Sequence, residues 1–295
     1  MSAVTLVLAG LAVLVVAFIA VWMASARAGH PHGAPAPLHY AVGAVGLFFD
    51  SLGIGNFAPT TAVFRLTRMV KDELIPGTLN VSSSIPVAVE AFAFIAVITV
   101  DATTLVSMVV VGAVGGWIGA RIVSRLPRRP IQIGMGTALF VGAWMMTMTN
   151  LELFPGGGDA VGLSGAVLLF ALGANFFFGM VEALGIGSYA PSLILLPLLG
   201  MDPRAAFPIM MGSAAYILPS CGMKFLRTGR YDGRVALGIT LGGIPGVLVA
   251  VYVVKSLPLT MLRWLVVVVV LYAAVSLLLA ARSRTSAPTS DVSGT

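Results

Sequence analysis

The chain of 295 residues is 58% hydrophobic and only 9% charged. Together with a mean hydropathy of +1.02, this composition leaves no room for a soluble domain and places most of the chain in lipid. The formal net charge of +6 would suggest nucleic acid in a soluble protein, but here it reflects where Lys and Arg flank the membrane spans. The single cysteine, Cys221, excludes an internal disulfide.

The first predicted element is an apolar stretch from Ala3 to Met23. It is long enough to cross the hydrocarbon core of about 30 Å as an uncleaved helix. Residues 1–37 are therefore predicted to form an additional transmembrane helix and a linker. The pair His30-x-His32 in this Pro-rich linker is too weak a pattern for a metal site.

Apolar runs of membrane-spanning length follow, and they predict an all-α polytopic membrane protein. They lie at 76–100, 103–124, 131–149, 160–181, 205–223, 233–254 and 260–281. Shorter apolar runs lie at 38–50, 56–68 and 188–199. A helix of about 13 residues reaches about 20 Å, which is less than the membrane thickness. We therefore expect each short run to be a half-helix that ends inside the bilayer.

The same glycine motif occurs beside the short runs of both halves. Leu52-Gly53-Ile54-Gly55-Asn56-Phe57-Ala58-Pro59 returns 132 residues later as Leu184-Gly185-Ile186-Gly187-Ser188-Tyr189-Ala190-Pro191. Further matches keep an offset of 131 or 132 residues, namely Asp50 with Glu182, Pro76 with Pro208, Ser82 with Ser213, Asp101 with Asp232 and Leu126-Pro127 with Leu257-Pro258. This register predicts a duplication, with a first repeat at 38–150, a second repeat at 160–281 and a disordered tail at 282–295.

The distribution of basic residues predicts how the broken elements lie in the membrane. If each one returns to the side from which it entered, 14 of the 17 Lys and Arg residues gather on one side, as the positive-inside rule requires. Three full spans then separate equivalent loops, so the two halves are inverted and their glycine tips approach from opposite faces. Glycine-broken elements in inverted halves indicate the binding site of a transporter.

The glycine tips have the chemistry of an anion site. Asn56 and Ser188 follow the glycines and are expected to cap the half-helices, so that each tip presents unpaired backbone N–H groups and a positive helix end. The predicted substrate-binding residues are tip residues and nearby small polar groups: Gly53, Gly55, Asn56, Asn80, Ser82, Ser83 and Ser84 in the first half, and Gly185, Gly187, Ser188, Tyr189 and Ser213 in the second. The alternative is that the glycines only allow close helix packing.

Several motifs together resemble the TauE/SafE sulfite exporter family, also described as toluene sulfonate uptake permeases. They are the paired Leu-Gly-Ile-Gly motifs, the loops led by Asp101 and Asp232, and the segment 115–121 (Gly-Gly-Trp-Ile-Gly-Ala-Arg) followed by Leu126-Pro127, all within residues 40–281. The resemblance implies a secondary transporter of sulfur-containing anions such as sulfite, sulfonates or sulfoacetate, coupled to protons. The chain departs from the family pattern at Asn56-Phe57 and Ser188-Tyr189, where further glycines are usual, and in its additional N-terminal helix.

Three carboxylic acids lie within or beside the predicted spans. Glu90 lies deep in the run 76–100, while Asp50 and Glu182 each precede a glycine tip. Because a carboxylate near an anion site repels the substrate unless it is protonated, these three residues are predicted proton carriers. The alternative is that each is a structural acid, hydrogen-bonded to its neighbours.

The sequence thus predicts a multi-pass carrier of the cytoplasmic membrane whose partners are a small anion, protons and membrane lipid, with no nucleic acid and no cofactor. An enzyme is not expected, because no histidine falls in a full-length predicted span to serve as a base or metal ligand. The main alternative is an anion channel with a constriction at the two tips. A scaffold subunit of a larger complex is a further alternative.

Overall fold

The structure is a computed structural model that describes residues 2–27, 34–122, 128–151, 153, 158–182 and 188–283. Among these residues all regular secondary structure is helical. The α-helices are α1 (Ala3–Arg27), α2 (Pro37–Ser51), α3 (Phe57–Thr67), α4 (Ile75–Val97), α5 (Ala102–Ile122), α6 (Arg128–Asn150), α7 (Gly165–Glu182), α8 (Tyr189–Leu198), α9 (Ala206–Thr228), α10 (Gly233–Ser256) and α11 (Leu259–Ser283). Two short 3₁₀ helices, η1 (Asp72–Leu74) and η3 (Pro203–Ala205), precede α4 and α9.

Eight helices in the described part of the chain are long and apolar enough to cross a membrane, namely α1, α4, α5, α6, α7, α9, α10 and α11. The predicted short runs correspond to α2, α3 and α8. The prediction of an all-α, multi-pass membrane protein is confirmed at this level. Of the tail predicted at 282–295 only the first two residues are described, at the end of α11, and His30 and His32 lie outside the described residues.

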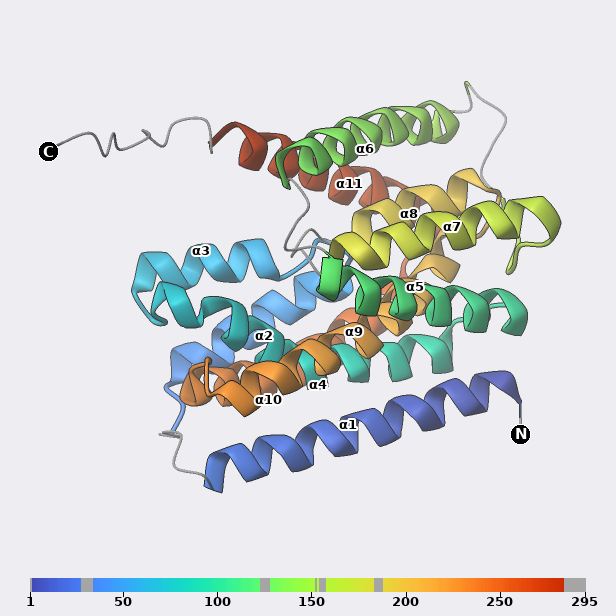
Figure 1. Ribbon diagram of the computed structural model, residues 1–295. Helices are drawn as coiled ribbons and strands as arrows, with labels where there is room; N and C mark the ends of the chain where they lie inside the picture. Colours follow the sequence, from blue (N-terminus) through green and yellow to red (C-terminus); the bar gives the residue numbers. More distant parts are fainter. Residues whose placement is uncertain are drawn as a thin grey trace, which may run out of the picture.

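The helices pack in pairs around a central pair, α4 and α9 (Figure 1). α2 lies along α10, α5 along α7 and α6 along α11, while α10 packs on α4 and α5 packs on α9. Between the central helices the rings of Phe94 and Phe207 stack, with centroids 5.2 Å apart. Since α9 is buried along most of its length, the core of the molecule lies around it.

Glycines allow two of these helix pairs to approach closely. A Cβ atom added at Gly242 of α10 would lie 2.1 Å from the backbone oxygen of Tyr40 in α2. In the α5–α7 pair, a Cβ atom added at Gly115 would lie 2.1 Å from the backbone oxygen of Phe176. Small residues thus allow the backbones of these two helix pairs to come close together.

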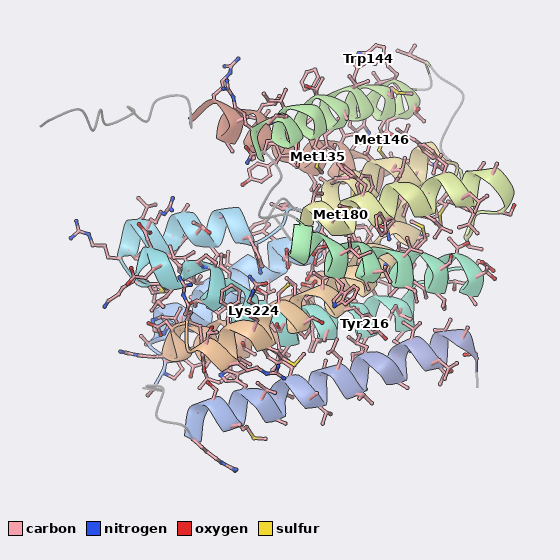
Figure 2. The ribbon with its side chains drawn as sticks, viewed as in Figure 1. Met135, Trp144, Met146, Met180, Tyr216 and Lys224 are labelled. Atoms are coloured by element: carbon pink, nitrogen blue, oxygen red, sulfur yellow. The ribbon has the colours of Figure 1, made fainter. Side chains whose placement is uncertain are left out.

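The additional helix α1 lies on the outside of the molecule, against α9. Tyr216 of α9 faces α1 (Figure 2), and its hydroxyl donates a hydrogen bond to the backbone oxygen of Val7. At the other end of α1, the Ser25 hydroxyl donates to the backbone oxygen of Leu226 at 3.0 Å. α1 is thus fixed to α9 at both ends rather than by its apolar surface alone.

Hydrogen bonds between segments show which helix ends lie together. Arg234 at the start of α10 donates to the backbone oxygen of Ala34, just before α2, at 2.7 Å. The backbone N–H of Asp232 donates to Thr78 of α4 at 2.9 Å. α2 and α4 therefore begin at the same end of the molecule, so α2 and α3 enter from this end and return to it, at the left in Figure 1.

The opposite end holds the start of α7 and the end of α8. The backbone N–H of Leu163, just before α7, donates to Thr104 of α5 at 2.9 Å. After α8, the N–H of Asp202 donates to the backbone oxygen of Ala160 at 2.9 Å. The α2–α3 element and the α7–α8 element thus enter the molecule from opposite ends.

Candidate functional site

The chain between α2 and α3 is turned by two glycines in a conformation that favours this residue. Gly53 and Gly55 have φ angles of +91° and +81°, where a side chain would be strained. The Gly53 N–H donates to the backbone oxygen of Asp50 at 2.7 Å. A Cβ atom added at Gly53 would lie 2.2 Å from Leu193 Cδ1. The tip of the first half therefore touches α8 of the second half.

Asp50 binds the tip that was predicted to offer free backbone N–H groups. Its Oδ1 accepts a hydrogen bond from the Asn56 backbone N–H at 2.8 Å. The prediction of an unpaired N–H is therefore wrong at this position. A carboxylate at a helix N-terminus is favoured both by the helix dipole and by a charge-assisted hydrogen bond, so Asp50 already holds the place expected for a substrate anion.

The two predicted capping residues do precede their helices, but their side chains bind elsewhere. Asn56 and Ser188 make no side-chain capping hydrogen bond. Asn56 Nδ2 donates to Ser83 Oγ at 3.1 Å, and Ser188 Oγ donates to Glu182 Oε2 at 2.8 Å. The prediction of side-chain caps is thus wrong, because each polar group has a partner on a neighbouring helix or across its own turn.

Three carboxyl groups, from both halves, lie near one another and near the tip of the first half. Asp50 is buried on α2, Glu90 is fully buried on α4, and Glu182 ends α7. They lie close enough for the charges of Glu90 and Glu182 to act on Asp50, and all three act on Tyr189 of α8. Neither of the two ion pairs recorded for the described residues involves them.

Only one of the two carboxyl oxygens of Glu90 has a hydrogen-bond partner. Its Oε1 lies 2.7 Å from the Ser51 hydroxyl oxygen, and the single hydroxyl proton is shared between Glu90 and the Leu47 backbone oxygen, 2.8 Å away. Its Oε2 and the Oδ1 of Asn56 are buried and make no hydrogen bond to any described residue. Buried polar atoms without partners are costly, so this cluster is a place where a proton or a ligand group is favoured.

A cavity of about 190 Å³ lies where the two halves meet. Its walls include the tip of the first half, the start of α8, and residues of α6 and α11. Its polar lining includes Tyr189 together with Gln132, Tyr272 and Ser276. This volume admits a small oxyanion, and the hydroxyl and amide groups can donate hydrogen bonds to it.

Some of the predicted substrate-binding residues lie in or beside the tip cavity, and others lie away from it. Gly53, Gly55 and Tyr189 line the cavity, and Asn56, Ser83 and Ser188 are bound beside it. Four others hydrogen-bond backbone oxygens of their own helices, three or four residues earlier, and line no cavity described here: Asn80, Ser82, Ser84 and Ser213. Gly185 and Gly187 lie outside the described residues.

The sequence reasoning missed four polar residues of this region, Ser51, Gln132, Tyr272 and Ser276. Gln132 had a usable signal, because an amide within an apolar span is costly and is by default functional. Tyr272 and Ser276 are four residues apart and therefore share a helix face. Ser51 had no signal, since the position one repeat later is Ala183.

The described residues contain no group of three His, Cys, Asp or Glu side chains that could hold a metal ion. Comparisons of the chain with protein-family models, with curated proteins and with solved structures found no match. The resemblance to the sulfite exporter family therefore stays a prediction.

Proposed function

We propose that this protein is a proton-coupled secondary transporter of the cytoplasmic membrane that moves a small sulfur-containing anion such as sulfite or an organosulfonate. The observation that carries the proposal is the cavity between the two halves, which has a glycine tip in its wall, while Asp50 and Glu182 hydrogen-bond Asn56 and Ser188 next to wall residues. Transporters with broken helices bind their substrates at such a place. The sulfur chemistry rests on the family resemblance.

We also propose that the chain consists of two inverted repeats, 38–150 and 160–281. The sequence register pairs α2 with α7, α3 with α8, α4 with α9, α5 with α10 and α6 with α11. If each helix is replaced by its counterpart, the α2–α10 pair turns into the α7–α5 pair, and both pairs are in contact. The α4–α9 and α6–α11 pairs each consist of two counterparts, so the exchange leaves them unchanged, and both are also in contact. Two related halves around a twofold axis give this pattern, and the opposed entry of the short helices supports inversion.

The tip provides a way to couple protons to the anion. The Asn56 N–H can bind either the Asp50 carboxylate, as it does here, or a substrate oxygen. Protonation of Asp50 weakens its hold on this N–H and removes a negative charge from the tip that forms part of the cavity wall. The acids Glu90 and Glu182 and the phenol of Tyr189 lie near Asp50, and Lys224 acts together with Glu182 on Cys221. In this proposal a proton at Asp50 and an anion at the tip bind together.

The test is uptake of radiolabelled sulfite and sulfoacetate into proteoliposomes, with and without an inwardly directed proton gradient. The proposal predicts saturable uptake that the gradient drives. Asn56→Leu should abolish it, because the apolar side chain fills the space beside the tip. No uptake of any sulfur anion would refute the substrate class, and conductance far above carrier turnover would favour the channel.

A further inference from the structure

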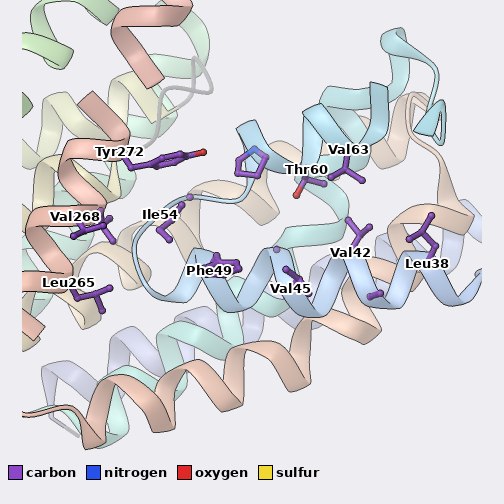
Figure 3. Close-up of a pocket in the computed structure, with 15 residues that line it drawn as sticks. Leu38, Val42, Val45, Phe49, Ile54, Thr60, Val63, Leu265, Val268 and Tyr272 are labelled. Atoms are coloured by element: carbon purple, nitrogen blue, oxygen red, sulfur yellow. The ribbon is translucent and has the colours of Figure 1, made fainter. Parts of the chain in front are cut away.

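A second, larger cavity adjoins the tip cavity and has no role in the proposed transport. It is a groove of about 660 Å³ between α2, α3 and α11. Its lining is apolar except for the hydroxyls of Thr60 and Tyr272. In Figure 3, Leu38, Val42, Val45 and Phe49 form a row along α2, with Val63 of α3 above them and Val268 of α11 at one end.

The groove exists because the two halves differ. In the second half, α8 packs on α6 and α11, and a Cβ atom added at Gly142 of α6 would lie 2.8 Å from Ile194. In the first half, α3 has its main contacts with α2 and α4 instead. The residue one repeat before Ile194 is Ala62, which is exposed. Apolar side chains fill the space in one half, and the corresponding space is open in the other.

The groove opens toward lipid and has the depth of one leaflet. Three of its wall residues are exposed large apolar side chains, with exposed fractions of 58% for Val45, 44% for Phe49 and 63% for Val268. From Leu38 to Phe49 the rise along α2 is about 16 Å, and half of the hydrocarbon core is about 15 Å. A single acyl chain has this length and this chemistry.

Unpaired basic residues lie at the outer end of the groove. Arg68 follows α3 directly and Lys71 precedes η1; both are exposed and take part in neither ion pair of the described residues. Arg65, one turn earlier, is paired with Asp72 at 3.2 Å. Basic residues at the membrane surface attract anionic headgroups, so the polar end of a lipid has a place here.

We propose that the groove binds an acyl chain of an anionic phospholipid, with the headgroup at Arg68 and Lys71. The inner end of the groove is lined by Ile54 and Gly55, which also line the tip cavity. The chain end therefore contacts the tip, and a bound lipid keeps α3 apart from α11. The inference needs only a membrane-embedded chain and does not depend on the transported anion.

The test uses phosphatidylglycerol and phosphatidylcholine, each with a photoactivatable diazirine near the end of one acyl chain, in proteoliposomes of the full chain. We expect phosphatidylglycerol to label the inner wall, at Phe49, Ile54 or Tyr272, several times more than phosphatidylcholine. Val45→Trp and Val268→Trp should each reduce this labelling at least fivefold. Val275→Trp is the matched control, because Val275 lies on α11, is 47% exposed and is outside the groove; it should change labelling less than twofold.

A second readout is the thermal midpoint of the purified protein, which phosphatidylglycerol should raise in the parent chain and not in Val45→Trp. Labelling confined to residues outside the groove would overturn the proposal. Equal labelling by both lipids would overturn the assignment of Arg68 and Lys71.

Loss of labelling on addition of octanesulfonate would assign the groove to a substrate's own chain. Rapid disulfide formation between Ala62→Cys and Ala273→Cys, with Cys221→Ser, would show that α3 closes the groove itself; either result contradicts a lipid site.

Discussion

At the scale of single residues, Gly53 and Gly55 differ in what surrounds them. Both have a positive φ, but a Cβ atom added at Gly53 would meet Leu193, whereas one at Gly55 would meet nothing within 4 Å. Backbone strain alone applies at Gly55, and strain plus a steric clash applies at Gly53.

We expect Gly53→Ala to cost about 2 kcal/mol or more in the free energy of unfolding, and Gly55→Ala about 1 kcal/mol. The control is Gly134→Ala within α6, where a Cβ atom would meet nothing and helix propensity improves. Unfolding in detergent, followed by circular dichroism, measures the three changes. Equal stability of all three variants would contradict the contact between the tip and α8.

Glu90→Gln tests whether the fully buried acid passes the coupled proton to or from Asp50 or only accepts a hydrogen bond. The amide oxygen still accepts the Ser51 hydroxyl bond, so the fold is kept while the proton is not. Gradient-driven sulfite uptake should fall at least tenfold, and exchange of labelled for unlabelled sulfite should persist. Glu73→Gln, at an exposed position in η1, serves as control. Equal loss of uptake and exchange would make Glu90 a structural residue.

At the scale of elements, the helices follow from apolar runs, and their ends follow from local caps. Asp101 precedes α5 and accepts the Thr104 backbone N–H at 2.8 Å. Asp232 precedes α10 and accepts the Val235 N–H at 3.0 Å. The Thr104 hydrogen bond lowers the pKa of the Asp101 carboxyl from its ordinary value, because it favours the charged form.

Because the pKa of Asp101 is lowered on folding, its contribution to stability is present above its unfolded pKa of about 3.9 and is lost as the pH falls through the folded value. Asp101→Ala should cost about 1 kcal/mol at pH 7, and less below pH 4. Asp101→Asn should keep most of the cap and lose its pH dependence. Denaturation at both pH values decides this; a cost for Asp101→Ala that does not change with pH would contradict it.

The close α2–α10 contact is a second property of elements. Gly242→Ala should cost about 1–3 kcal/mol, because the added methyl group meets the backbone of α2. Gly173→Ala, at a helical glycine with open space, should be neutral or stabilising. Thermal midpoints compare them, and a neutral Gly242→Ala would mean that the two helices separate easily.

At the scale of the whole molecule, the sequence was sufficient to predict the helices. Apolar runs have a length set by the bilayer, so α2, α3 and α8 could be recognised as short. The partners of polar side chains could not be predicted, because hydrogen-bond direction depends on tertiary contacts: Ser83 reaches Asn56, whereas Ser82 and Asn80 bond their own helix. The difference between α3 and α8 was not predicted, although the segments matched in register differ in composition: Thr61 and Arg65 of α3 correspond to Leu193 and Pro197 of α8.

The central claim is that the protein binds a proton at Asp50 when it binds an anion at the tip of the first half. The most direct measurement is calorimetric titration of the purified protein with methanesulfonate between pH 5 and 8, in buffers of different ionisation enthalpy. This anion stays fully ionised in that range, so any proton taken up belongs to the protein. We expect about one proton bound per anion in the parent chain and close to none in Asp50→Asn, with binding retained. Anion binding without proton uptake, or an unchanged proton count in Asp50→Asn, would contradict the claim.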